Sequence, residues 1–177
     1  MVIALAGRRI DAPDAETKRF PADNAAAVQQ KIREFITNNK ACAMISAAAC
    51  GADLLAQEVA TEMRLRRRIV LPYDRQAFKQ SSVADRPGDW AERYDLLIPE
   101  VALQGGLTEF DYEKDQEETF FATNHDILDE AEKIARQMNQ KVTALVVWDG
   151  HSRGEDDVTG HFLEEAKLRG LQVAEIL

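Results

Sequence analysis

The sequence of 177 residues has only two cysteines, Cys42 and Cys50, and no CxxC pair. A disulfide framework or a structural zinc site needs more thiols at closer spacing, so we expect a protein of the reducing cytoplasm with no bound metal or other cofactor. No stretch approaches the ~20 apolar residues of a membrane span, and the apolar start is too short for a signal peptide. We therefore expect a soluble protein with no membrane partner.

Basic side chains are in the minority, because 22 Lys and Arg stand against 31 Asp and Glu, a net charge of −9. Broad binding to nucleic-acid backbones needs clustered Lys and Arg, so the charge predicts no nucleic-acid partner. The one dense basic run, residues 64–68, is interpreted as the solvated end of a helix. Three scattered histidines show no spacing typical of metal ligands.

The common nucleotide and hydrolase motifs are missing too. No GxGxxG follows the first apolar run, and no GK[ST] closes a phosphate loop. These absences exclude a dinucleotide fingerprint and a Walker loop. No GxSxG elbow is present, which argues against a serine hydrolase.

What the chain does have is an alternation of short apolar runs and helical periodicity. Strands are predicted at 2–6, 41–46, 69–71, 142–148 and 171–176, and helices at 24–37, 52–65, 90–98, 113–140 (with a break near 123–125) and 159–169. Continuously apolar strands that alternate with helices indicate a parallel sheet. Residues 1–177 are thus predicted to form a single α/β domain, three-layer and Rossmann-like, with a mainly parallel sheet covered by helices on both faces.

Ligands in such sheets bind beyond the carboxyl ends of the strands, where three loops lie. The first loop is Gly7, Arg8 and Arg9. Glycine permits a sharp exit from the strand, and an arginine fork suits a phosphate or a carboxylate. Alternatively, both arginines pair with surface acids.

The second loop lies within ISAAACGADLLAQEVA, residues 45–60, and joins a strand to a helix through small residues. Backbone N–H groups at such a helix start favour a phosphate. Tight packing of helix on strand is the alternative, and Asp53 is also a candidate cap of its own helix. The ligand-binding candidates of this loop are Ser46, Ala47, Gly51, Ala52 and Asp53.

The third loop follows the most strand-like run of the chain. Asp149 and Gly150 stand directly after that strand, where the carboxylate accepts hydrogen bonds from a ribose or caps the turn. Thr159 offers a hydroxyl at the start of the next helix. The acidic residues 155–157 beside that helix start repel a phosphate unless they point away.

Together these segments resemble the SLOG superfamily, which unites SMF/DprA proteins and LOG-type phosphoribohydrolases. The residues that carry the resemblance are AGRRID (6–11), RFP (19–21), ISAAACGADLLAQEVA (45–60), LPY (71–73) and WDG (148–150). Their order is most similar to SLOG-type domains found beside cyclase and signalling modules. The resemblance implies a nucleotide or nucleotide-derived phosphorylated ligand over the strand ends. The PGGxGTxxE signature of LOG enzymes is not kept, since the chain has RGEDDVTGHFLEEA instead.

Three functions stay open at this point. The first is a module that binds or senses a nucleotide without turning it over, which the missing signature favours. The second is an N-glycosidic hydrolase or transferase, LOG-like or deoxyribosyltransferase-like, with Asp53, Glu58 or Asp149 as the catalytic carboxylate; a lone domain favours it. The third is an interaction domain with a vestigial pocket. Beyond the nucleotide, the expected partners are a second copy of the chain or a separately encoded signalling protein.

Overall fold

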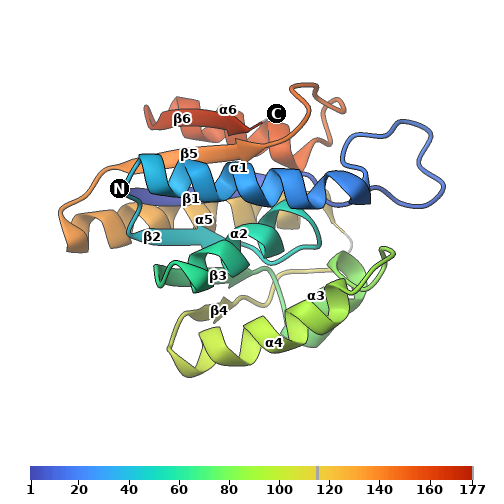
Figure 1. Ribbon diagram of the computed structural model, residues 1–177, viewed down its shortest axis with the longest axis horizontal. Helices are drawn as coiled ribbons and strands as arrows, with labels where there is room; N and C mark the ends of the chain where they lie inside the picture. The colour runs from blue at the N-terminus through green and yellow to red at the C-terminus, as the bar shows by residue number, and fades with distance from the viewer. Residues whose placement is uncertain (115, 177) are drawn as a thin grey trace.

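A parallel sheet of six strands runs through the described part of the chain (Figure 1). The computed structural model describes residues 1–114 and 116–176. Within them the strand order is β4-β3-β2-β1-β5-β6, and every pairing is parallel. The strands are β1 (Val2–Gly7), β2 (Ala43–Ser46), β3 (Arg66–Leu71), β4 (Leu107–Glu109), β5 (Val142–Val147) and β6 (Gln172–Ile176).

Helices cover both faces of this sheet. They are α1 (Ala25–Asn38), α2 (Ala52–Glu62), α3 (Arg75–Ser82), α4 (Trp90–Leu103), α5 (Glu117–Met138) and α6 (Val158–Leu168), with a 3-10 turn, η1 (Ala22–Asn24), before α1. Helices α1, α2 and α4 pack on the face turned to the viewer in Figure 1, and α5 and α6 pack on the other. The predicted three-layer, Rossmann-like α/β fold is confirmed. Among the described residues, no helix is long and apolar enough to cross a membrane.

The central strands β1 and β5 are buried on both faces, which explains their continuous apolar sequences. Successive side chains of a strand point to opposite faces. Ile3 and Leu5 accordingly join the core under α1 and α2, whereas Val2 and Ala4 join the core under α5 and α6. One apolar run thus contributes to two cores.

The basic run at residues 66–68 belongs to strand β3, so its prediction as a helix end was wrong. Helix α2 already ends at Glu62. Arg67 is buried, and its guanidinium donates to Glu100 at 2.7 Å and to the Thr61 hydroxyl at 2.5 Å. A long arginine stem can pack as apolar surface while its head reaches polar partners, so a strand near the edge of the sheet tolerates such residues.

Helix α5 is continuous through residues 123–125, where a break was predicted. The Thr123 hydroxyl donates to the Thr119 carbonyl at 2.7 Å, one turn earlier. The Asn124 amide donates to the Val158 carbonyl at 2.8 Å, on α6. These partners satisfy polar groups that otherwise compete with the helical backbone bonds.

At the edge of the sheet one strand was missed and one helix was predicted too short. Strand β4 has only three residues, two of them exposed, and so it lacks an apolar pattern. It depends on tertiary packing rather than on local sequence, since β4 pairs only with β3 among the described strands. Helix α4, predicted to end at residue 98, continues through Pro99 to Leu103.

The strand order reverses between β1 and β5. From β1 the chain continues to β2 on one side, and later returns as β5 on the other side, with Gly7 paired to Val147. A Cβ on Gly7 would lie 2.5 Å from Ala52 Cβ and 2.7 Å from the Val147 carbonyl oxygen, so only glycine allows α2 to approach here. A crevice for ligands is expected beyond the carboxyl ends of the strands at such a switch point.

Candidate functional site

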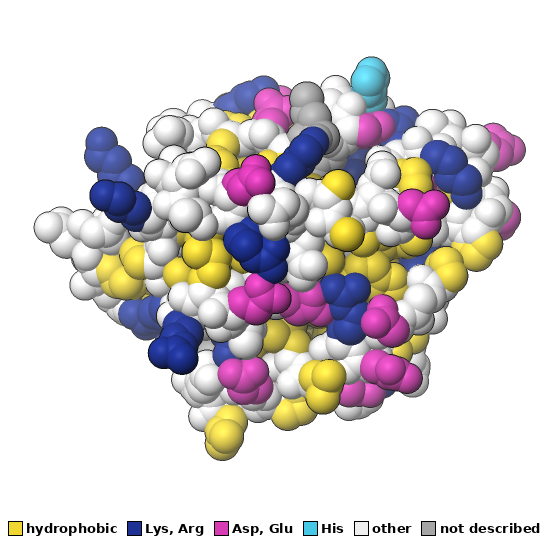
Figure 2. All heavy atoms as spheres, viewed as in Figure 1, with side chains coloured by type: hydrophobic (Ala, Val, Ile, Leu, Met, Phe, Trp, Pro, Cys, Tyr) yellow, Lys and Arg dark blue, Asp and Glu magenta, His cyan; other side chains and the backbone are white. Residues whose placement is uncertain are grey.

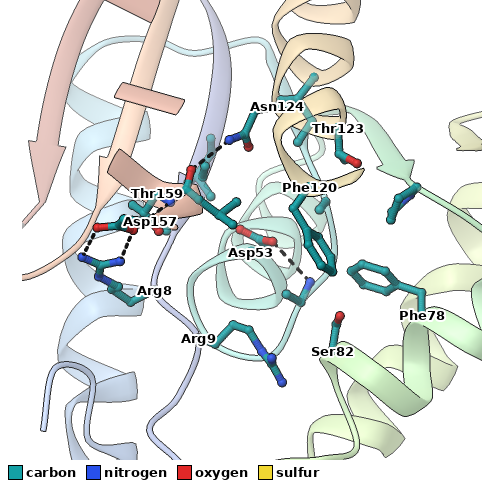
Figure 3. Close-up of a pocket in the computed structure, with 18 of the residues that line it drawn as sticks. Arg8, Arg9, Asp53, Phe78, Ser82, Phe120, Thr123, Asn124, Asp157 and Thr159 are labelled. Atoms are coloured by element: carbon teal, nitrogen blue, oxygen red, sulfur yellow. Dashed lines mark hydrogen bonds and ion pairs between the residues drawn. The ribbon is translucent and has the colours of Figure 1, made fainter. Parts of the chain in front are cut away.

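A pocket of about 240 Å³ lies beyond the carboxyl ends of β1, β2 and β3 (Figure 3). The start of α2, helix α3, the first half of α5 and the loop before α6 complete its walls. Residues from all three predicted loops line it. They are Gly7, Arg8, Arg9, Ala47, Asp53 and Thr159.

Other lining residues were missed by sequence reasoning. Phe78 and Ser82 come from α3, Phe120 and Asn124 from α5, and Arg153 from the loop before α6. The α5 residues that line the pocket recur at positions i, i+3, i+4 and i+7, namely Phe120, Thr123, Asn124 and Ile127. That spacing marks one helix face and was readable in the sequence, whereas nothing in the sequence places that face over the ends of the strands.

The start of helix α2 is not open to an anion as predicted. The Ala52 N–H donates to the Arg8 carbonyl at 3.1 Å, and Arg9 forms a β-bridge with Gly51. Gly51 has φ of 103°, and a Cβ there would lie 2.7 Å from the Arg8 carbonyl oxygen. The small residues of this loop therefore serve close packing against the loop after β1, and neither Gly51 nor Ala52 lines the pocket.

Asp53 is the buried carboxyl group of the pocket. Its side chain does not cap its own helix, because Oδ2 accepts from the Ala49 N–H of the preceding loop at 3.2 Å. Oδ1 has no hydrogen-bond partner among the described residues, and the residue is 7% exposed. Burial raises the pKa of Asp53 to about 7, although the Ala49 N–H and the Arg9 guanidinium lower it. Asp53 can therefore exist as a neutral or a charged group near neutral pH.

Arg8 is committed to Asp157 and is not free to bind a ligand. Its guanidinium donates to both carboxylate oxygens of Asp157, at 2.5 and 2.9 Å, and to the His151 carbonyl at 2.6 Å. Asp157 also caps α6 by accepting from the Thr159 N–H at 3.1 Å. Burial raises the pKa of Asp157, but hydrogen bonds from Arg8 and from backbone amides outweigh it and hold the pKa at about 2.

The acidic stretch before α6 is thus partly neutralised. Asp157 points at Arg8, while residues 155 and 156 are exposed to solvent. The predicted repulsion of a phosphate is therefore reduced at residue 157 and remains at Asp156, which lines the pocket. At the start of α6, the Thr159 N–H is occupied by the Asp157 carboxylate.

Asp149 and Gly150 lie outside the pocket wall. The Asp149 carboxylate accepts from Arg19 at 2.7 Å and lies 3.5 Å from Arg8 Nε. Burial raises the pKa of Asp149, and hydrogen bonds from backbone amides and Arg19 lower it to below its usual value. The structure therefore gives Asp149 the role of holding arginines rather than of contacting a ribose.

Ser46 and Glu58 also lie away from the pocket. The buried Ser46 hydroxyl donates to the Ala47 carbonyl at 2.6 Å and accepts from Gln57 at 2.9 Å. Both carboxylate oxygens of Glu58 accept from Arg93, at 2.6 and 2.5 Å. The catalytic candidate Glu58 is thus an ion-pair partner that joins α2 to α4.

Arg153 is the cation at the pocket that has no acidic partner. Its backbone N–H donates to Asp157, but no hydrogen bond or ion pair involves its guanidinium within residues 1–114 and 116–176. Burial, with the neighbouring Arg8, lowers the pKa of Arg153. Arg9, by contrast, forms an ion pair with Asp85. The pocket therefore has one arginine available for an anion.

Across the described chain, no group of three or more His, Cys, Asp or Glu side chains is placed to hold a metal ion.

Comparison with known proteins adds a likeness in fold. No family model and no curated protein matches the sequence. The X-ray structure of DNA processing protein A (DprA) from Streptococcus pneumoniae is similar at a TM-score of 0.42 and 16% sequence identity. The match covers 98% of this chain and 58% of that chain, so this chain spans little more than half the length of that protein. The likeness concerns the fold alone.

The expectation of no nucleic-acid partner is corrected. The similar structure is that of a DNA processing protein. The exclusion was wrong, because a net charge of −9 describes the whole surface and does not exclude one site that binds nucleic acid. Figure 2 shows basic and acidic side chains intermixed on the face that carries α1, α2 and α4.

Proposed function

We propose that the pocket binds a nucleotide or a nucleotide-derived phosphorylated ligand, and that the chain is a SLOG-type domain most similar to those beside cyclase and signalling modules. The observation that carries the binding proposal is the polarity of the pocket. Figure 3 shows the rings of Phe78 and Phe120 at one end and the Arg8–Asp157 pair at the other, with Asp53 between them. A nucleotide has a corresponding arrangement, with the flat faces of an aromatic base at one end and an anionic phosphate at the other.

The anionic end of the ligand is assigned to Arg153. Arg8 is held by Asp157, and Arg9 by Asp85, so Arg153 is the arginine whose guanidinium is available. A guanidinium fork binds phosphate through two parallel charge-assisted hydrogen bonds. A phosphate would also give the Arg153 guanidinium the direct ionic contact that it does not make to any described residue.

The base is assigned to the aromatic end. Phe78 is nearly fully buried and is held by Tyr73 and Tyr94, whose ring centroids lie 6.1 and 6.4 Å from its own. Phe120 is partly exposed and faces the same pocket from α5. Aromatic walls with a few polar groups are typical of sites for flat organic ligands.

Replacing Arg153 by alanine tests the proposal. We expect the variant to bind nucleoside 5′-monophosphates about tenfold or more weakly, while its affinity for the matching nucleosides is unchanged, because only the phosphate contact is lost. Isothermal titration calorimetry measures both affinities. The control is Arg136→Ala, an exposed arginine in the last turn of α5, at the opposite end of that helix. If none of the monophosphates binds, or if Arg153→Ala binds them as the wild type does, the proposal fails.

A second function, cleavage of an N-glycosidic bond, is favoured by one observation, the buried Asp53 carboxyl. A group whose pKa lies at about 7 can protonate a leaving base near neutral pH. In that reaction the proton of Asp53 passes to a ring nitrogen, the C1′–N bond breaks with its electron pair going to the base, and water adds to C1′. The proton released by that water restores Asp53.

Release of free base is the measurement for this second function. If Asp53 is the general acid, we expect free base from a nucleoside monophosphate, and a rate lower by about 100-fold or more in Asp53→Asn. High-performance liquid chromatography detects the base. The Glu58→Gln variant serves as the control, because Glu58 lies outside the pocket. No base released from purine or pyrimidine monophosphates would leave the protein as a binding module.

A further inference from the structure

The two oxygens of the Asp53 carboxyl have different environments. Oδ2 accepts a hydrogen bond from the Ala49 N–H at 3.2 Å, whereas Oδ1 has no partner among the described residues. In a neutral carboxyl the carbonyl oxygen is the better hydrogen-bond acceptor, so Oδ2, which accepts from the Ala49 N–H, is assigned as the carbonyl oxygen and Oδ1 as the protonated one. In its neutral form Asp53, a residue of the pocket wall, therefore carries its O–H donor on the buried and unpartnered Oδ1.

A buried hydrogen-bond donor without an acceptor costs free energy, and a ligand that offers an acceptor removes this cost. Asp53 is 7% exposed, so solvent does not satisfy Oδ1 well. The apolar residues Ala47, Phe78 and Phe120 line the same pocket, together with polar residues of α3 and α5. A ligand that fills this space with a flat ring must therefore offer Oδ1 a hydrogen-bond acceptor.

Few charged groups act on this carboxyl. Arg9, in the loop after β1, lowers its pKa, while the desolvation caused by burial raises it. The pocket walls supplied by α3 and α5 carry uncharged polar groups such as Ser82, Thr123 and Asn124. The other charged side chains that line the pocket are Arg8, Arg153, Asp156 and Asp157.

Building on the proposed nucleotide binding, we propose that Asp53 selects the base of the ligand. The Oδ1–H group pairs with an unprotonated ring nitrogen, which adenine presents as N1 and cytosine as N3. Hypoxanthine and uracil present a ring N–H at the same position. Two donors would then face each other in a buried place, and neither would find an acceptor. Asp53 is thus a specificity-determining residue for amino-substituted bases.

The experiment compares nucleotides whose bases differ only in the amino or carbonyl group and in the protonation of the ring nitrogen beside it. AMP and IMP form one pair, CMP and UMP the other, and calorimetry gives their affinities at about pH 6 and about pH 8, on either side of the carboxyl transition. At pH 6 we expect the wild type to bind the amino member of at least one pair about tenfold or more tightly. The preference falls at pH 8, because the ionised carboxylate accepts instead of donating. The phosphate titrates alike within a pair and cancels in the ratio.

The matched variant is Asp53→Asn, whose amide keeps the shape of the side chain. Its carbonyl can accept from the Ala49 N–H, so its NH₂ group faces the pocket as a donor at every pH. We expect this variant to keep the preference for the amino member and to lose its pH dependence, a result that a purely structural role would not produce. A ratio below tenfold for both pairs at pH 6, or a pH dependence that survives in Asp53→Asn, overturns the selectivity while leaving nucleotide binding intact. No binding of any of the four nucleotides overturns both proposals.

Discussion

Asp157→Ala is expected to lower the free energy of unfolding by about 3–5 kcal/mol, the usual cost of removing one partner from a buried ion pair. Arg8 is 3% exposed and gives both carboxylate oxygens of Asp157 a hydrogen bond. Without that carboxylate the buried guanidinium keeps only the His151 carbonyl and the more distant Asp149, 3.5 Å from its Nε, as partners. Helix α6 also loses its cap at the Thr159 N–H. Urea unfolding followed by circular dichroism measures the change.

The control for this prediction is the neighbouring residue. Asp156→Ala removes the same charge from an exposed position, and we expect a change within about 0.5 kcal/mol. The pH dependence has a defined sign, because the pKa of Asp157 is held at about 2, below the usual value of 3.8. Its contribution to stability is present above that usual value and is lost as the pH falls through about 2. Equal stability of the two variants would contradict the role of the buried pair.

Gly51→Ala is expected to lower the free energy of unfolding by about 3 kcal/mol or more, from backbone strain and overpacking together. The φ of 103° is one that residues with a Cβ rarely adopt. The added Cβ would also lie 2.7 Å from the Arg8 carbonyl oxygen and 2.8 Å from the Ile10 nitrogen, both backbone atoms that cannot rotate away. The bridge between this loop and Arg9 would open, so we also expect a weaker ligand affinity in calorimetry.

Gly105→Ala is the matched control for Gly51→Ala. It also has positive φ, at 68°, but no atom lies within 4 Å of the position of its Cβ. We expect a loss of only about 1 kcal/mol, from the left-handed backbone alone. Denaturant midpoints of the two variants measured side by side give the comparison. If Gly51→Ala costs no more than Gly105→Ala, close packing is not the reason for glycine in this loop.

The fold was largely readable because the central strands carry their own signal. Strands β1 and β5 are buried on both faces, so burial appears in the sequence as unbroken apolar runs. Strand β4 gave no such signal, since its short, exposed sequence becomes a strand only by pairing with β3. The burial of Arg67 in β3 was not predictable from local sequence either, because its guanidinium binds partners in α2 and α4.

The candidate site was readable only in outline. The position of the pocket beyond the strand ends follows from an alternating α/β pattern, and Gly7, Arg9 and Asp53 do line it. The availability of each group did not follow from the pattern. Arg8 was predicted to hold a ligand and is instead held by Asp157, 149 positions away in the chain. Arg153 was not singled out, although its guanidinium is the available one.

By itself the sequence determined an alternating α/β chain whose apolar strands meet polar loops at one edge of a sheet. The spacing of apolar residues and the positions of glycines are sufficient to predict these elements, because strands, helices and turns depend on residues that are close together in the chain. Only the tertiary structure decided which polar groups neutralise each other and which stay unsatisfied. The loop with small residues around Gly51 is closed by packing, whereas Asp53 beside it lines the pocket and keeps one unpartnered carboxyl oxygen. Burial and pairing arise between segments that are distant in the chain, and they decide the charge and hydrogen bonding of each group.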